Sequence, residues 1–362
     1  MIKRILITGN EAIAQGAIDA GCEFYAGYPI TPQNELIAYM AKYMPEHNRI
    51  FIQAESELAA INMVLGAAST GARAMTSSSS PGISLKQEGI SYLAGTELPA
   101  VIVNIMRGGP GLGNISPSQS DYFQATRSGG HGDYHSIVLA PSTVQEAYDF
   151  MPLAFHLADK YRTPAIILGD GMLGQMMEPI VVNGQWSMVN GKRKKPSTID
   201  YRLSAKPWAL TGCKDRKPNI IRSLYLGEGV LEQFNLKLQR KYKDIEKNEP
   251  RYEGLFLDDA KIILVAYGTM ARIAKSAMHA LRAKGKKAGL IRPITLWPFP
   301  KKAFIQHPGA AGTKYLVTEM SYGQMLEDVL LAVNGRVRVG FFGRSGGGIP
   351  TEEEIIKHAK NL

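Results

Sequence analysis

Two acidic residues stand where a predicted buried strand gives way to a helix. The strand is predicted at 50–53, Glu55 and Glu57 follow it, and a helical pattern rich in small residues occupies 57–69. Burial at such a junction disfavours the charged form of a carboxyl group, so either glutamate is a candidate for proton transfer. The alternative is a carboxylate in the first turn of the helix that only stabilises the helix macrodipole.

Thr31 is a second candidate, in the loop after the predicted strand 24–26. Pro29 and Pro32 stiffen this loop, and Thr31 presents its hydroxyl at the expected carboxyl edge of a sheet. Thr31 also suits the N-cap of a helix at 33–43, with Pro32 at the first helical position. The two roles are compatible, and the sequence leaves both open.

Four consecutive serines, Ser77, Ser78, Ser79 and Ser80, follow the predicted strand 72–76. Hydroxyl and backbone N–H groups at a strand end that leads into a helix suit an anion or the polar edge of a cofactor. A run of serines is also typical of an ordinary loop, so its meaning depends on its neighbours.

Arg107 follows the apolar stretch 100–105 and precedes the glycine-rich loop 108–111. Its planar guanidinium is suited to binding a carboxylate through two parallel hydrogen bonds. The alternative is an ordinary surface ion pair.

Short apolar runs alternate with longer helical patterns through the first 180 residues. Runs without polar alternation are typical of a parallel sheet covered on both faces, which is an α/β fold. Ligands bind such sheets at the carboxyl ends of the strands. Strands are predicted at 5–8, 24–26, 50–53, 72–76, 100–105, 137–140 and 165–168, and helices at 10–20, 33–43, 57–69 and 144–160.

Residues 186–255 break this rhythm and are predicted to form a connecting arm with one helix at 228–247. In this helix Leu231, Phe234, Leu238, Tyr242 and Ile245 form an apolar stripe that is expected to pack on a neighbour. Residues 191–251 carry 16 Lys/Arg against 7 Asp/Glu, a net +9 of the chain's +10. This basic segment, with its run Lys192 to Lys195, is either a solvated face or a docking surface for an acidic partner or a phosphate-bearing ligand.

The last third of the chain, 256–362, restarts the alternation and is predicted to be a second, smaller α/β domain after a first domain at 1–185. Its strands are predicted at 261–266, 287–291, 315–319 and 337–341, and its helices at 270–284 and 325–333.

The composition argues against several classes of protein. Cys22 and Cys213 lie far apart and outside any CxxC motif, so neither a disulfide framework nor a four-thiolate iron–sulfur cluster is expected from this chain. Neither a secretory signal nor a membrane-spanning stretch is found, which predicts a cytoplasmic protein without a membrane partner. No nucleic-acid-binding motif accompanies the basic charge. The glycine-rich surroundings of His131 and His135 argue against a helical metal site.

Seven stretches of the sequence resemble the α subunit of the 2-oxoacid:ferredoxin oxidoreductases. The likeness spans most of the chain, and the first four stretches in this order are highly specific. Within the family the sequence is most similar to the 2-oxoisovalerate, or branched-chain, type, with the 2-oxoglutarate type as a near relative. The stretches are GNEAIAQGAIDAGCEFYAGYPITPQ, FIQAESELAAINMVLGAA, TSSSSPGISLKQEGISY, VNIMRGGPGLG, GGHGDY, IRPITLWPFP and VTEMSYGQM.

The resemblance implies a thiamine-diphosphate-binding domain of the pyrimidine-binding type, followed by a domain like the C-terminal domain of transketolase. It favours Glu57 over Glu55 as the contact to the aminopyrimidine of thiamine diphosphate, because Ala59-Ala60 and Gly66 follow Glu57 as in related thiamine enzymes.

Further site residues follow from the same likeness. Thr31 and Arg107 would meet the carboxylate of the 2-oxoacid. The serines at 77–80, together with Pro29, would line the same pocket.

The resemblance also implies a hetero-oligomer that converts a 2-oxoacid, CoA and oxidised ferredoxin to acyl-CoA, CO₂ and reduced ferredoxin. A β subunit would hold Mg²⁺ and the diphosphate, and 4Fe–4S clusters would lie on the β subunit or on a small ferredoxin-like subunit. A γ subunit would be a further partner. Asp170, in Gly169-Asp170-Gly171, lacks the following asparagine that a diphosphate signature needs, so it is predicted to end a strand and no metal is expected here. The alternatives are a 2-oxoglutarate- or pyruvate-specific member, or a non-catalytic assembly subunit.

Overall fold

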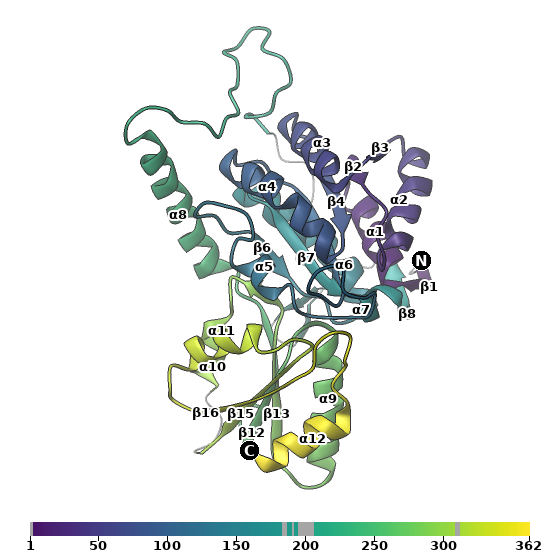
Figure 1. Cartoon of the computed structure of the whole chain (residues 1–362), viewed down its shortest axis with the longest axis vertical. Coiled ribbons are helices and arrows are strands. Elements are labelled where there is room, and N and C mark those ends of the chain that lie inside the picture. Colours follow the sequence, from purple (N-terminus) through teal and green to yellow (C-terminus); the bar gives the residue numbers. More distant parts are fainter. Residues whose placement is uncertain (1–2, 183–186, 190–191, 195–205, 308–311) are drawn as a thin grey trace.

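The computed structural model describes residues 3–182, 187–189, 192–194, 206–307 and 312–362. These residues form two α/β units stacked along the long axis of the molecule, with the N-terminal unit above the C-terminal unit in Figure 1. None of the described helices combines the length and the apolar character that a membrane crossing requires.

The first unit is built on a sheet with strand order β14-β6-β7-β5-β4-β2-β3. Its strands β2 to β7 pair in parallel, and every residue of β4, β5, β6 and β7 is buried. This burial on both faces explains their uniformly apolar sequences and confirms the predicted α/β class. The strands are β2 (Phe24–Gly27), β3 (Ile50–Gln53), β4 (Ala74–Ser78), β5 (Val101–Met106), β6 (Ile137–Leu139) and β7 (Ala165–Asp170).

The helices of this unit pack in two groups. α1 contacts α2 and α6, whereas α3 contacts α4. Side-chain caps mark several starts, and Thr8, Ser56 and Thr143 each accept a backbone N–H at the beginning of α1, α3 and α6. The helices are α1 (Gly9–Asp19), α2 (Asn34–Glu46), α3 (Glu57–Ser69), α4 (Ser80–Gly95), α5 (Tyr122–Thr126), α6 (Val144–Tyr161) and α7 (Gly171–Gln175).

The predicted first strand exists but does not join the parallel sheet. β1 (Lys3–Thr8) pairs antiparallel with β8 (Met177–Val182) in a separate two-stranded ribbon. Leu6 is 67% exposed, whereas its neighbour Ile7 is buried. Burial on one face only is typical of an antiparallel ribbon, so the prediction that this apolar run belongs to the parallel sheet is wrong.

The second unit has a sheet with strand order β11-β13-β12-β15-β16, in which β13, β12, β15 and β16 are parallel. α9 packs against α12, and α10 packs against α11. The unit comprises β11 (Tyr252–Leu255), β12 (Ile262–Val265), α9 (Gly268–Ala283), β13 (Ala288–Pro293), α10 (Lys301–Gln306), β15 (Lys314–Glu319), α11 (Gln324–Val333), β16 (Arg338–Gly343) and α12 (Glu352–Asn361).

Two strands cross the expected divisions of the chain. β11 lies in the segment expected to be an arm, yet it pairs antiparallel with β13 of the second sheet. β14 (Thr295–Trp297) lies in the expected second domain, yet it pairs antiparallel with β6 at the edge of the first sheet. The ring of His135 stacks on Trp297 at a centroid distance of 4.5 Å. The two units are therefore joined by a shared sheet edge.

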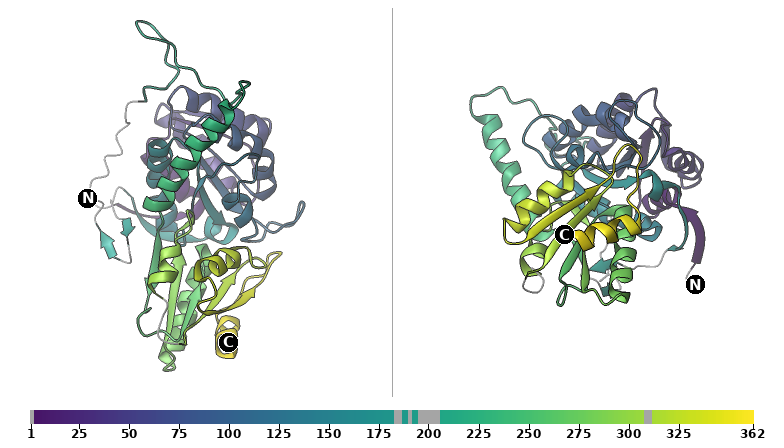
Figure 2. Two further views of the ribbon diagram at one scale, coloured as in Figure 1. Left: turned by 90° about the vertical axis from the view of Figure 1, so that its left-hand side faces the viewer. Right: turned by 60° about the horizontal axis from the view of Figure 1, so that its bottom comes forward.

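The predicted arm helix is α8 (Val230–Asn248), which lies along the flank of the first unit (Figure 2). Its C-terminal half buries Leu238, Tyr242 and Ile245, whereas Leu231 near its start is 47% exposed. Part of its positive charge is neutralised within the chain, because Lys237 and Lys241 both pair with Glu97.

The basic run ahead of this helix is described only in part. Its residues Lys192–Lys194 form β10, which pairs with β9 (Ser187–Val189), and Lys195 lies outside the described residues.

Glu249, at the C-terminal end of α8, forms hydrogen bonds with two residues of α6 and with Arg251. Its carboxylate accepts hydrogen bonds from Lys160 Nζ at 2.7 Å, Tyr161 OH at 2.7 Å and Arg251 Nη1 at 2.9 Å. Burial alone would raise the pKa of Glu249, but these partners lower it from 4.5 to about 2. The carboxylate therefore stabilises the fold above its ordinary pKa, and this contribution is lost as the pH falls toward 2.

We expect Glu249→Gln to lower the free energy of unfolding at neutral pH by about 1.5–3 kcal/mol, because it removes charge-assisted hydrogen bonds. Urea denaturation at several pH values measures this difference, which should shrink as the pH falls below 4.5. Glu246→Gln, on an exposed residue of the same helix, is the control. A difference that does not depend on pH would contradict this assignment.

Candidate functional site

The four candidate motifs meet at one edge of the first sheet. They follow β2, β3, β4 and β5, which are neighbours in the order β5-β4-β2-β3. Because these strands run parallel, their carboxyl ends lie at the same edge, where ligands bind in open α/β sheets.

Glu57 is the first residue of α3 and is 6% exposed, whereas Glu55 is exposed to solvent. The Ser56 hydroxyl caps the helix by accepting the Ala59 backbone N–H at 3.1 Å. This cap fixes the first turn of α3 and turns the Glu57 side chain inward. Only Glu57 therefore has the shielded surroundings expected of a proton-transferring carboxyl group.

The Glu57 carboxylate lies against Gly82 in the first turn of α4. A Cβ atom on Gly82 would lie 2.5 Å from Glu57 Oε1 and 2.1 Å from Ser78 Oγ. Both oxygens therefore surround the same bare α-carbon, and a side chain at this position would push them apart. No sequence pattern marks this glycine, rather than those at 108–111, as the neighbour of the candidate carboxylate.

Within the described residues, Ser77 forms side-chain hydrogen bonds, whereas the hydroxyls of Ser78 and Ser79 have no hydrogen-bond partner. Ser77 Oγ contacts Tyr25 OH at 2.6 Å and donates to Gln33 Oε1 at 2.7 Å. The hydroxyls of Ser78 and Ser79 are buried and have no hydrogen-bond partner in the described part of the chain. Such groups are rare in folded proteins unless a ligand or water satisfies them.

Arg107 lies at the end of β5 and is 7% exposed. Its Nη1 donates to the Thr31 backbone oxygen at 2.9 Å and its Nη2 donates to the Leu112 backbone oxygen at 3.2 Å, while its buried Nε has no partner within the described residues. The guanidinium thus sits beside the Thr31 loop and forms no ion pair in the described part of the chain. The alternative of a surface ion pair is wrong.

The predicted capping role of Thr31 is also wrong. α2 begins at Asn34, and its N-cap residue is Gln33. Gln33 is fully buried and its side chain accepts the Ser77 hydroxyl, so the backbone at 32–33 turns inward before the helix begins. The Thr31 hydroxyl has one long contact, from Asn34 Nδ2 at 3.4 Å, and Pro29 is exposed.

Asp121 belongs to this edge and was not predicted. Its carboxylate accepts Ser80 Oγ at 2.6 Å and Asn104 Nδ2 at 2.9 Å, and the Arg107 backbone N–H donates to Ser80 Oγ at 3.0 Å. Burial raises the pKa of Asp121, against the opposing effects of these hydrogen bonds and of the nearby Arg107 charge. The loop around Asp121 carries no local pattern, so only the folded chain places it beside β5.

This edge fits one side of a polar heteroaromatic ring, such as the aminopyrimidine of thiamine diphosphate. Among the described residues it offers a shielded carboxylate at Glu57 and two buried hydroxyls without partners, at Ser78 and Ser79. The unsatisfied hydroxyls and the carboxylate are the kinds of groups that pair with ring nitrogens and an exocyclic amine.

Comparison with known proteins supports this chemistry. Residues 15–246 match the family model described as pyruvate flavodoxin/ferredoxin oxidoreductase, thiamine diphosphate-binding. Residues 260–355 match pyruvate:ferredoxin oxidoreductase core domain II. The chain belongs to the pyruvate flavodoxin/ferredoxin oxidoreductase family.

Within this family the chain is similar to subunits of a ketoisovalerate oxidoreductase and of a 2-oxoglutarate synthase. It is 48% identical to the ketoisovalerate oxidoreductase subunit VorB of Methanothermobacter marburgensis, over 99% of this chain and 97% of that one. It is 38% identical to the 2-oxoglutarate synthase subunit KorA of Methanocaldococcus jannaschii, over 96% of both.

Two solved structures share the architecture. A 2-oxoglutarate:ferredoxin oxidoreductase from Magnetococcus marinus, with 2-oxoglutarate, coenzyme A and succinyl-CoA bound, matches with a TM-score of 0.82 at 28% identity. The match covers 99% of this chain and 65% of that one. A split-gene transketolase matches with a TM-score of 0.59 at 13% identity over 98% of this chain, a likeness of fold alone, and confirms the predicted transketolase-like architecture.

Asp170 ends a strand, as predicted, and caps the helix that follows. It is the last residue of β7, and its Oδ1 accepts the backbone N–H groups of Met172 and Leu173 at the start of α7. Among the described residues, no three His, Cys, Asp or Glu side chains are grouped as metal ligands.

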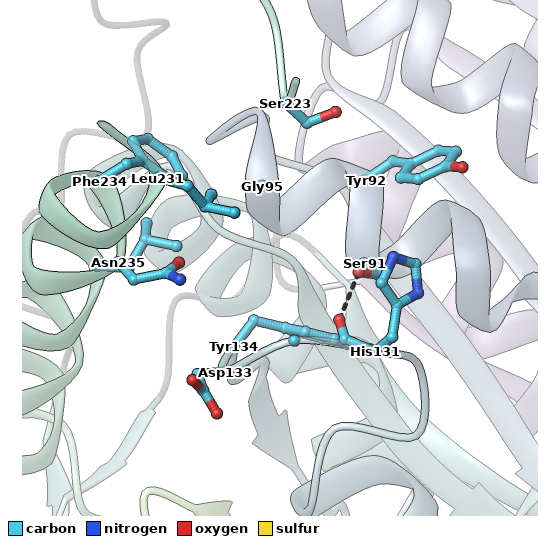
Figure 3. A pocket seen from close by; sticks show the side chains of 12 residues that line it. Ser91, Tyr92, Gly95, His131, Asp133, Tyr134, Ser223, Leu231, Phe234 and Asn235 are labelled. Atoms are coloured by element: carbon cyan, nitrogen blue, oxygen red, sulfur yellow. Dashed lines mark hydrogen bonds between the residues drawn. The ribbon is translucent and has the colours of Figure 1, made fainter. Parts of the chain in front are cut away.

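A separate cavity of about 220 Å³ lies at the far end of α4, between this helix, the loop 131–134 and α8 (Figure 3). His131 and Asp133 line it together with Tyr92 and Phe234, and the His131 backbone oxygen accepts Ser91 Oγ at 2.7 Å. Ser91, the lining residue of α4 nearest to Gly82, comes nine residues after it, about 14 Å along the helix. The cavity is therefore distinct from the edge that holds Glu57.

We expect Gly82→Ala to destabilise the protein by about 1–3 kcal/mol, because the added methyl group must displace Ser78 Oγ or Glu57 Oε1. Gly66→Ala is the matched control, since a Cβ at this helical glycine meets nothing within 4 Å. It should stabilise the protein by about 0.5–1 kcal/mol. Thermal unfolding of both variants measures the difference, and equal effects would contradict the close contact at Gly82.

Proposed function

We propose that this chain is the pyrimidine-binding subunit of a CoA-dependent 2-oxoacid:ferredoxin oxidoreductase whose substrate is 2-oxoisovalerate or a related branched-chain acid. The reaction converts the 2-oxoacid, CoA and oxidised ferredoxin to acyl-CoA, CO₂ and reduced ferredoxin. The observation that carries the proposal is the meeting of Glu57, Ser78 and Gly82 at one strand edge. It occurs in a chain 48% identical to a ketoisovalerate oxidoreductase subunit.

Glu57 would hold a proton at N1′ of the aminopyrimidine. Its position at the start of α3, shielded from water, lets it exchange a proton with a ring nitrogen at hydrogen-bonding distance. Ser78 and Ser79 supply hydroxyls of the same pocket, while Ser77, Ser80 and Pro29 shape its walls. When bound, thiamine diphosphate would supply a nucleophilic carbon for the keto carbon and would accept the electron pair left behind when CO₂ departs.

Arg107 and Thr31 would orient the carboxylate of the 2-oxoacid. A guanidinium has five N–H donors, and within the described residues two of those of Arg107 are engaged, both by backbone oxygens. The unpartnered Nε and the remaining Nη donors can pair with a carboxylate in the fork geometry that arginine favours. The Thr31 hydroxyl lies in the loop that Arg107 already contacts.

The remaining parts of the catalyst would lie on partner chains. We propose that a β subunit holds Mg²⁺ and the diphosphate, that 4Fe–4S clusters lie on the β subunit or on a small ferredoxin-like subunit, and that a γ subunit is a further partner. The two cysteines are apart, one buried and one exposed, and Asp170 is engaged in capping α7. Since CoA and ferredoxin are intracellular, the proposal includes a cytoplasmic location.

Glu57→Gln should reduce turnover of the assembled complex by about 10²–10⁴-fold, because the amide cannot exchange the proton. Glu55→Gln, on an exposed neighbour, is the matched control and should leave turnover unchanged. Steady-state reduction of ferredoxin measures both. Near-wild-type turnover in Glu57→Gln would contradict the catalytic role of Glu57 and would favour the alternative of a non-catalytic assembly subunit.

Arg107→Met should lower kcat/KM for the 2-oxoacid by roughly tenfold to a hundredfold, the loss expected for a charge-assisted contact of about 1.5–3 kcal/mol. Arg240→Met, which removes an exposed arginine of α8, is the control. An unchanged kcat/KM in the Arg107 variant would exclude it from the carboxylate site.

The substrate itself is tested by purifying the native complex, identifying its chains, and assaying 2-oxoisovalerate, 2-oxoglutarate and pyruvate. The proposal expects the highest kcat/KM with 2-oxoisovalerate. A preference for 2-oxoglutarate or pyruvate would correct the substrate alone, whereas turnover by the isolated chain without iron would overturn the whole assignment.

A further inference from the structure

Lys86 is a fully buried lysine beside the proposed cofactor carboxylate, and the chemistry described above gives it no role. It is 0% exposed and lies on α4 one turn after Gly82, so the two residues share a helix face. Gly82 lies against the Glu57 side chain, and Lys86 lies against the Glu57 backbone.

The Lys86 ammonium has two hydrogen-bond acceptors. Its Nζ donates to Thr76 Oγ1 on β4 at 3.0 Å and to the Glu57 backbone oxygen on α3 at 3.3 Å. One side chain therefore joins α4, β4 and the first residue of α3. No carboxylate of the described residues lies at ion-pair distance from it, so the charge is buried without a direct counter-ion.

Burying a charged amine carries a large desolvation free energy. An apolar side chain of similar length, such as methionine, would pack in the same position without the cost of removing a charge from water. Burial lowers the pKa of Lys86 to about 8, against the opposing charge of Glu57. Glu57 is the one titratable group of the described residues that acts on it, since the facing residue of β4 is Thr76.

We infer that Lys86 is a positioning residue for the proposed reaction, which holds the first turn of α3 in place and lowers the pH at which the bound aminopyrimidine that pairs with Glu57 loses its proton. The inference rests on the proposed function, because it concerns the contact between Glu57 and the cofactor.

The direction of the electrostatic effect follows from the sign of the charge. A positive ammonium near Glu57 disfavours a bound proton on the Glu57–aminopyrimidine pair, so it lowers the pH at which this pair loses its proton. Above about pH 8 the amine becomes neutral and the effect fades. Lys86→Met removes the charge at every pH and should move the midpoint upward.

The test uses the assembled complex with thiamine diphosphate and Mg²⁺ added in excess. The near-ultraviolet circular dichroism difference spectrum, with minus without thiamine diphosphate, is followed between pH 6 and pH 9 in the absence of substrate. This signal reports the protonation state of the bound aminopyrimidine without requiring turnover. Lys86→Met, Thr76→Val, Glu57→Gln and the exposed control Lys243→Met are compared with the wild type.

We expect Lys86→Met to raise the midpoint by at least about one pH unit, a tenfold change in proton affinity. Thr76→Val, which removes one acceptor of the ammonium, should shift the midpoint in the same direction by less, and it keeps the inference testable if the methionine variant fails to assemble. Lys243→Met should leave the midpoint unchanged.

Two results would overturn the inference in distinguishable ways. If Glu57→Gln abolished the titration but Lys86→Met and Thr76→Val left the midpoint in place, Lys86 would be a packing residue only. If Glu57→Gln left the titration as in the wild type, Glu57 would not contact the aminopyrimidine, and the inference would fall with the proposed function.

Discussion

The close packing of α3 on α4 at Gly82 is the contact on which the rest of the site depends. Because Gly82 has no side chain, the first turn of α3 approaches near enough for Glu57 to lie beside Ser78 without exposure to water. The same approach brings the Glu57 backbone within reach of Lys86. The parallel sheet then adds Arg107 and the Thr31 loop from neighbouring strands, since their carboxyl ends share one edge.

Charge at this edge is concentrated and shielded. Glu57, Lys86 and Arg107 are each less than a tenth exposed, and Asp121 joins them through Ser80 and Asn104. Charges in such surroundings act on one another more strongly than at a solvated surface. Hydroxyls and a guanidinium donor at this edge have no partner among the described residues, which is typical of a site that a ligand or water completes.

Much of the fold followed from the sequence because the buried strands are uniformly apolar. α3 begins at the predicted residue, and the strands that carry the motifs were found within a few residues. The pairing of distant strands could not be predicted from the sequence, because no local pattern marks the partner of a strand. β1 pairs with β8 in a separate ribbon, and β14, from the second unit, pairs with β6 of the first sheet. For the same reason Asp121 was not predicted. Thr31 was wrongly predicted at the N-cap position of α2, which Gln33 occupies.

In the proposed reaction the Glu57 carboxylate contacts N1′ of the aminopyrimidine. A structure of the assembled complex with thiamine diphosphate bound would test this contact. We predict a Glu57 oxygen about 2.6–3.2 Å from N1′. An aminopyrimidine whose N1′ faced Glu55, or a cofactor bound away from the ends of β3 and β4, would contradict the account.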